Sequence, residues 1–98
     1  MRKLFEDLFD LFKNFDYIDI SLNCSENYLK IYINDREIRK ELIIYLKNEM
    51  IYIEELDNSE YIELFSINSI LLDELFENNQ IILDFFRYYM KSLYGIRL

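Results

Sequence analysis

The stretch SILLDELFENNQIILDFFRYYMKSLYG, residues 69–95, is the longest helical pattern in the chain, and a fold can be built outward from it. In its second half the charged residues Asp84, Arg87 and Lys91 fall within one wedge of roughly 60° on a helical projection. The remaining apolar surface is about twice as wide as contact with one core requires. We therefore expect this helix to be buried on two sides, or to contact a second chain.

Gly95, the single glycine of the chain, ends this pattern. Glycine adopts the left-handed conformation at a helix C-terminus at little cost, and Ile96 can then fold back on Met90. The polar run 77–80 interrupts the apolar stripe. The sequence leaves open whether this run is one exposed turn or a break between two helices with an asparagine as N-cap.

The N-terminal part of the chain shows a helical pattern followed by strand patterns. In residues 3–14 apolar side chains recur every three or four positions, which predicts an amphipathic helix packed on a core. The same stretch also resembles an acidic activation motif, because bulky side chains are spaced among acids. Residues 17–24 and 28–33 alternate with period two, so they predict two strands joined by a turn at 25–27.

Residues 35–48 fit two kinds of structure. Four apolar residues follow helical spacing and Asn34 fits a loose capping box, so we predict a second helix. The apolar residues are Ile38, Leu42, Tyr45 and Leu46. The alternative is a strand through LIIYL with Asn34-Asp35 as a hairpin turn. Residues 50–56 and 60–67 predict two further strands joined by an Asp-Asn-Ser turn.

The expected architecture is a single α+β domain, residues 1–98, with the order α-β-β-α-β-β-α. It has a four-stranded, largely antiparallel sheet covered by helices on one face. Hydrophobic residues make up 52% of the chain, enough for a core without disulfides.

The single cysteine, Cys24, favours a reducing compartment. No apolar run is long enough to cross a bilayer, and acids interrupt the N-terminal segment where a secretory signal would lie. We therefore expect a cytoplasmic protein, or one in the host cytoplasm if its source is viral.

Charge is distributed unevenly along the sequence. The chain has 19 acidic and 11 basic residues, a net charge of −8, and no Lys or Arg lies between Lys47 and Arg87. The acids of that interval are Glu49, Glu54, Glu55, Asp57, Glu60, Glu63, Asp73, Glu74, Glu77 and Asp84. Phosphate backbones require cationic contacts, so this interval disfavours direct binding to nucleic acid. It suits either a solvated surface that keeps the protein soluble or steering toward a basic partner.

We predict that the partner-binding surface lies in this acidic interval. Tyrosine is enriched at interfaces, and Tyr52 and Tyr61 share strand faces with Glu54 and Glu63, respectively. The alternative is that tyrosine is simply favoured in strands. The predicted partner-binding residues are Glu54, Glu55, Asp57, Glu60, Glu63, Tyr52, Tyr61, Asp73, Glu74 and Glu77. The predicted self-association residues, on the wide apolar side of the last helix, are Phe85, Phe86, Tyr88, Tyr89 and Leu93.

Catalysis has little support in the sequence. The chain has no histidine, the commonest general base and metal ligand. The acids around residue 57 lack the spacing and the glycine of a calcium loop, and Cys24 has no basic neighbour in sequence to activate its thiol. A single glycine does not build a glycine-rich phosphate loop. We expect no catalytic residue, no metal site and no cofactor.

In size, acidity and richness in residues with AT-rich codons, the chain resembles anti-CRISPR proteins of phages and archaeal viruses. It is similar in the same way to the acidic immunity proteins that neutralise nuclease toxins. The resemblance rests on composition and implies a viral or mobile-element origin. It also implies an inhibitor that blocks the cationic groove of a nucleic-acid-binding protein by charge mimicry. The alternatives are a toxin immunity protein or antitoxin, and a structural or regulatory homodimer.

Overall fold

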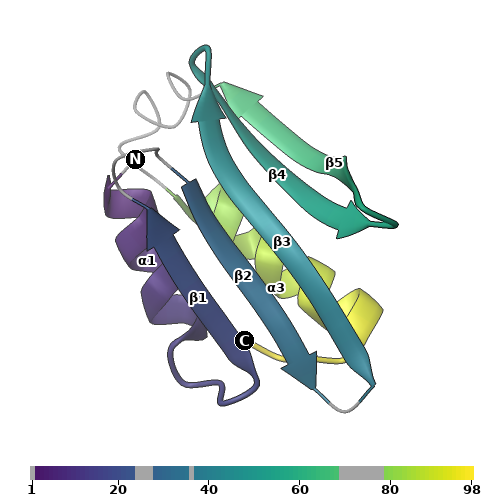
Figure 1. Cartoon of the computed structure of the whole chain (residues 1–98). Coiled ribbons are helices and arrows are strands. Elements are labelled where there is room, and N and C mark those ends of the chain that lie inside the picture. Colours follow the sequence, from purple (N-terminus) through teal and green to yellow (C-terminus); the bar gives the residue numbers. More distant parts are fainter. Residues whose placement is uncertain (1, 24–27, 36, 69–78) are drawn as a thin grey trace.

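The computed structural model of the protein describes residues 2–23, 28–35, 37–68 and 79–98, which form two helices and five strands (Figure 1). The helices are α1 (Arg2–Phe12) and α3 (Gln80–Tyr94). The strands are β1 (Ile18–Asn23), β2 (Tyr28–Asp35), β3 (Ile38–Lys47), β4 (Met50–Asp57) and β5 (Glu60–Asn68). Each strand pairs antiparallel with the next, so the sheet is a meander in the order β1-β2-β3-β4-β5.

The predicted order α-β-β-α-β-β-α with four strands is wrong, because residues 35–48 contain the central strand β3 and not a helix. β3 pairs with β2 on one side and with β4 on the other. Its inward side chains Leu42 and Ile44 are fully buried. Ile43 and Tyr45 point to the opposite face, so apolar residues on both faces hide the period-two pattern. The α+β class agrees with the structure.

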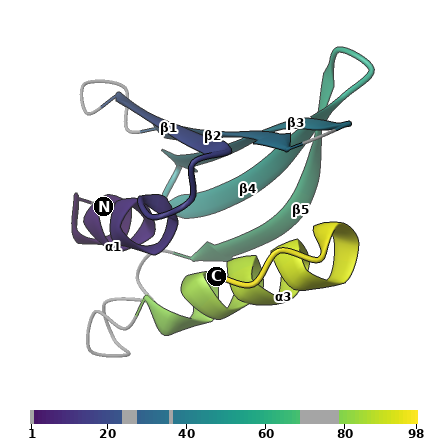
Figure 2. The same ribbon diagram turned by 90° about the horizontal axis from the view of Figure 1, so that it is seen from below.

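Both helices lie on the same side of the sheet, and no described element covers its other face (Figure 2). The core fills the space between sheet and helices, and its buried residues form one cluster. Phe12 of α1 and Phe86 of α3 meet there edge to face, with ring centroids 5.5 Å apart. Each large apolar side chain buried in this way contributes about 1.5–3 kcal/mol. In β2 the predicted alternation is confirmed, since Leu29, Ile31 and Ile33 are buried.

Two tight turns fix the register of the second half of the sheet. The β3–β4 and β4–β5 turns each contain two consecutive residues with positive φ, as two-residue hairpin loops require. These residues are Asn48 and Glu49 in the first turn, and Asn58 and Ser59 in the second. The β4–β5 pairing shifts once, between Ile53 and Glu54, and the resulting register sets Glu54 directly opposite Glu63.

The end of α3 is as predicted. Gly95 adopts the left-handed conformation with a φ of 67°, and its N–H donates to the Lys91 carbonyl at 3.1 Å. The Ile96 N–H donates to the Met90 carbonyl at 3.1 Å, and the Ile96 side chain is buried. The last carbonyls of the helix are thereby satisfied, and the chain turns back onto the core.

The start of α3 bears on the predicted interruption at 77–80. The helix begins at Gln80, with Asn79 at the N-cap position, but the Asn79 side chain makes no capping hydrogen bond. It donates instead to the Asp7 carboxylate of α1 at 2.8 Å, and this bond lowers the pKa of Asp7. Asn79 therefore joins the two helices. Residues 69–78, the first part of the predicted long helix, lie outside the described residues, as does Cys24.

Replacing Gly95 tests how the chain leaves α3. A Cβ at this position would meet no atom within 4 Å, so Gly95→Ala changes only the cost of the left-handed conformation. We expect it to lower the free energy of unfolding by about 1 kcal/mol in urea denaturation. Gly95→Asn should lose less, because asparagine tolerates this conformation. Equal stability of the alanine variant and the parent protein would contradict this account of the turn.

Candidate functional site

The open face of the sheet carries acidic and aromatic side chains next to each other on β3, β4 and β5. Strand alternation points these side chains away from the buried Leu42, Ile44 and Ile53. We call six of them the acidic face: Glu41 and Tyr45 of β3, Tyr52 and Glu54 of β4, and Tyr61 and Glu63 of β5. The sequences of β4 and β5 contain no Lys or Arg, so neither strand supplies a cation to this face.

Hydrogen bonds and ring stacking fix the geometry of the acidic face. Tyr45 and Tyr52 are direct cross-strand neighbours, with stacked rings whose centroids lie 5.2 Å apart. The Tyr45 hydroxyl donates to Glu54 Oε2 at 2.8 Å, and the Tyr61 hydroxyl reaches across β4 to donate to Glu41. Burial, helped by these carboxylates, raises the pKa of Tyr45 and Tyr61 to about 12. Both hydroxyls therefore remain protonated donors at neutral pH.

The acidic face also contains a pair of like charges. Glu54 and Glu63 lie directly opposite each other across β4 and β5. Opposed like charges on neighbouring strands destabilise a sheet. In the part of the chain that the structure describes, no ion pair neutralises either carboxylate. We therefore expect this pair to lower the stability of the free protein.

The structure brings four of the predicted partner-binding residues together on the acidic face. They are Glu54, Glu63, Tyr52 and Tyr61. The sequence prediction missed Glu41 and Tyr45, because residues 35–48 were expected to form a helix. The signal that could have found them is the alternation of Arg39, Glu41, Ile43 and Tyr45 along one side of a strand.

Glu55 does not belong to the acidic face, because its side chain points to the helix side of the sheet. The hydroxyls of Tyr89 and Tyr94 donate to Glu55 Oε1 at 2.9 and 2.8 Å, and Lys40 Nζ lies 3.8 Å from the same oxygen. Burial raises the pKa of Tyr94 to about 12 and raises that of Tyr89 as well. Only 17% of the Glu55 side chain is exposed. Glu55 thus links the sheet to α3 through the two tyrosine hydroxyls, and its predicted contact with a partner stays a prediction.

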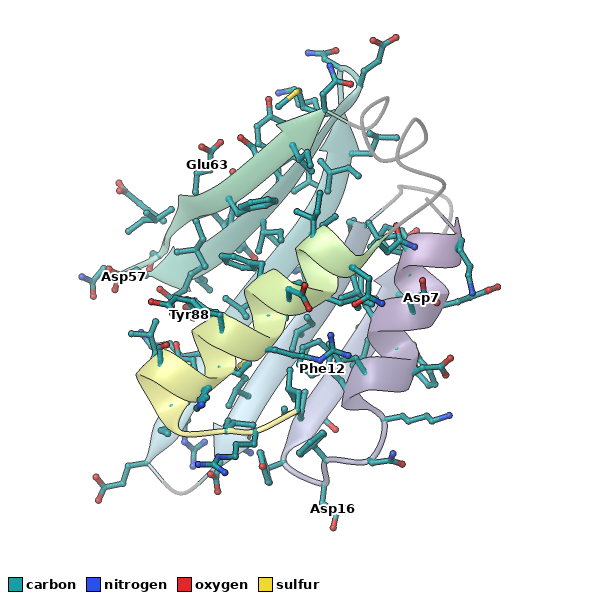
Figure 3. The ribbon with its side chains drawn as sticks, turned by 180° about the vertical axis from the view of Figure 1, so that it is seen from behind. Asp7, Phe12, Asp16, Asp57, Glu63 and Tyr88 are labelled. Atoms are coloured by element: carbon teal, nitrogen blue, oxygen red, sulfur yellow. The ribbon has the colours of Figure 1, made fainter. Side chains whose placement is uncertain are left out.

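The other predicted acids lie away from the acidic face or outside the described residues. Asp57 and Glu60 pair directly at the β4–β5 turn, where Glu60 is exposed (Figure 3 labels Asp57). They are a second pair of like charges on this hairpin. Asp73, Glu74 and Glu77 lie outside the described residues.

The residues predicted for self-association are divided between core and surface. Phe86 and Tyr89 are buried, and Phe85 stacks on β5. Tyr88 and Leu93 are exposed, at 74% and 62%. The wide apolar surface of α3 is thus used largely within the protein, where it packs on the sheet and on α1. Phe86 and Tyr89 are unavailable to a second chain while this core is intact.

Membrane spans and metal sites are two other features that the described residues could form. Among these residues no helix has the length and apolar character needed to cross a membrane. Within the same residues, no three His, Cys, Asp or Glu side chains are arranged to hold a metal ion. No protein-family model matches the sequence, and comparisons with curated proteins and with solved structures gave no significant match.

Removing the Glu55 carboxylate tests its structural role. Glu55→Ala leaves the hydroxyls of Tyr89 and Tyr94 without their acceptor, and we expect the free energy of unfolding to fall by about 2 kcal/mol. The control is Glu60→Ala, which removes an exposed carboxylate and its repulsion with Asp57 from the same hairpin, so it should leave stability unchanged or raise it by less than about 0.5 kcal/mol. Urea denaturation measures both. Equal effects of the two substitutions would contradict the structural role of Glu55.

Proposed function

We propose that this protein is a non-enzymatic inhibitor that docks its acidic face onto a basic, nucleic-acid-binding protein and blocks that protein by charge mimicry. The observation that carries the proposal is the opposed pair Glu54 and Glu63, which lies among tyrosines on a face that no described element covers and forms no ion pair with any described residue. The pair weakens the free protein, and a cation from a partner would relieve the repulsion.

A lysine or arginine side chain suits the space between these two carboxylates. Directly opposed residues have Cβ atoms roughly 4.5–5.5 Å apart, so one cation can contact both carboxylates. Charge-assisted hydrogen bonds of this kind are about twice as strong as neutral ones. The rings of Tyr45 and Tyr52 lie on the same face and can add cation–π attraction. Tyrosine and arginine are also the residue types that dominate binding energy at protein interfaces.

The fixed side-chain orientations of the acidic face distinguish it from a surface that serves solubility alone. Acids that only promote solubility need to be exposed and dispersed. Here Tyr45 holds Glu54 and Tyr61 holds Glu41, so two carboxylates have fixed orientations before any partner arrives. Side chains that are already ordered lose less entropy on binding, which favours affinity.

A nucleic-acid-binding protein is the partner class whose surface best matches this arrangement. Proteins that hold nucleic acid line their grooves with cations that follow the phosphate backbone. Ordered carboxylates beside stacked tyrosine rings offer such a groove negative charges and aromatic faces, as a nucleic-acid strand does. The resemblance in composition to anti-CRISPR proteins points the same way. An immunity protein or antitoxin directed at a nuclease would use the same face.

A binding experiment with matched variants tests the role of the acidic face. The probe is a fluorescent deca-arginine peptide, followed by anisotropy at low salt. Glu54→Gln with Glu63→Gln and the control Asp16→Asn with Glu37→Gln each change the net charge by two units. We expect the first variant to lose about tenfold in affinity, the equivalent of one charge-assisted contact, and the control to stay near the parent value. Equal losses would show that net charge alone attracts the peptide.

Competition with nucleic acid tests the mimicry itself. Proteins from a bacterial lysate are captured on the immobilised parent protein and on the Glu54→Gln, Glu63→Gln variant. We expect the parent protein to retain basic proteins that the variant does not, and a single-stranded oligonucleotide to release them. Captured proteins that stay bound at saturating oligonucleotide would contradict charge mimicry.

A further inference from the structure

β5 forms one edge of the sheet, and no described strand or helix lies beyond it (Figures 1 and 2). The first four residues of β5, from Glu60 to Glu63, are exposed. An exposed edge strand offers unpaired backbone groups to another extended chain. We propose that this edge binds an extended segment of the basic partner as a sixth strand of the sheet. This inference rests on the proposed function, because it gives the partner's mode of docking.

The two faces of this edge differ in chemistry. Tyr61 and Glu63 point to the acidic face, whereas Ile62 points to the helix side, where 47% of its surface is exposed. A strand added beside β5 alternates its own side chains between the same two faces. Its residues on the open face would lie beside Glu63, and the intervening residues would lie beside Ile62.

On the helix side of the sheet, β5 lies next to α3. Phe85 of α3 stacks on Phe65 of β5, with ring centroids 5.1 Å apart, so this side of the helix borders the edge strand. Tyr88 lies about one turn further along the helix, and 74% of its surface is exposed. Figure 3 shows Tyr88 on the side of α3 that faces the β4–β5 hairpin. Ile62 and Tyr88 thus provide apolar surface for the alternate side chains of an added strand.

The acidic residues of β5 favour a basic segment over a second copy of this chain as the added strand. A second copy of this chain would bring the Glu60 and Glu63 carboxylates of two β5 strands together, and opposed like charges destabilise strand pairing. A segment that alternates basic with apolar residues meets Glu63 on one face and Ile62 on the other. Main-chain hydrogen bonds would supply affinity and these alternating contacts specificity, as in other complexes formed by strand addition.

Two peptides test strand addition. One is a seven-residue peptide of alternating lysine and isoleucine, and the other has the same sequence with every backbone amide N-methylated. The methylated peptide keeps the charge but cannot donate main-chain hydrogen bonds. We expect the unmodified peptide to bind at least tenfold more tightly by calorimetry. We also expect hydrogen exchange of β5 amides to slow in the complex, while exchange in β1, the other edge strand, stays unchanged.

The outcomes separate the two proposals. Equal affinities, with β5 exchange unchanged, would overturn strand addition and leave cation binding by the acidic face intact. Slower exchange in β1 instead of β5 would likewise overturn it. Binding of neither peptide would contradict both proposals.

Ile62→Ser should weaken binding of the unmodified peptide severalfold. Phe9→Ser, a change of an exposed side chain on α1, should leave the affinity within twofold of the parent value. Equal effects of these substitutions would show that Ile62 does not contribute to peptide binding.

Discussion

The pairing of β3 on both of its edges is the constraint on which the rest of the structure depends. β3 joins the β1–β2 hairpin to the β4–β5 hairpin in one continuous sheet. On one face Leu42 and Ile44 enter the core beneath the helices. On the other face Glu41 and Tyr45 complete the acidic face. A helix at these positions would leave two separate hairpins, which are marginally stable alone, and it would abolish the row of side chains that crosses β3, β4 and β5.

The sequence was sufficient to predict the elements whose patterns are set locally. The first helix, the hairpin strands and the stop at Gly95 follow from spacing and from turn residues. β3 was missed because its apolar residues on both faces mimic helical spacing. A central strand owes its conformation to neighbours on both sides, which a local pattern does not contain. The predicted partner-binding residues lie on different faces of the sheet for a similar reason. Glu54 and Glu55 are equivalent as acids in a sequence, yet strand alternation sends one to the open face and the other to the hydroxyls of Tyr89 and Tyr94.

The two faces of the sheet differ in how their carboxylates are bonded. On the helix side two carboxylates are hydrogen-bonded: Glu55 accepts two hydroxyl bonds, and Asp7 accepts the amide of Asn79. On the open face Glu54 and Glu63 oppose each other, and neither carboxylate forms an ion pair within the described residues, although a single neutral side chain would remove the repulsion. Sites that bind partners often depart from the arrangement that is best for folding. The proposed function gives this departure a purpose, since the repulsion that weakens the free protein favours the complex.

A double-mutant cycle between Glu54 and Glu63 in the free protein tests this central claim most directly. The cycle compares the effect of Glu63→Gln on the free energy of unfolding in the parent protein and in Glu54→Gln, at low salt where charges are least screened. Repulsion predicts that Glu63→Gln stabilises the parent protein by about 0.2–1 kcal/mol and has little effect once Glu54 is neutral. An equal effect in both backgrounds would show that the two carboxylates do not interact, and the account of the acidic face would then be wrong.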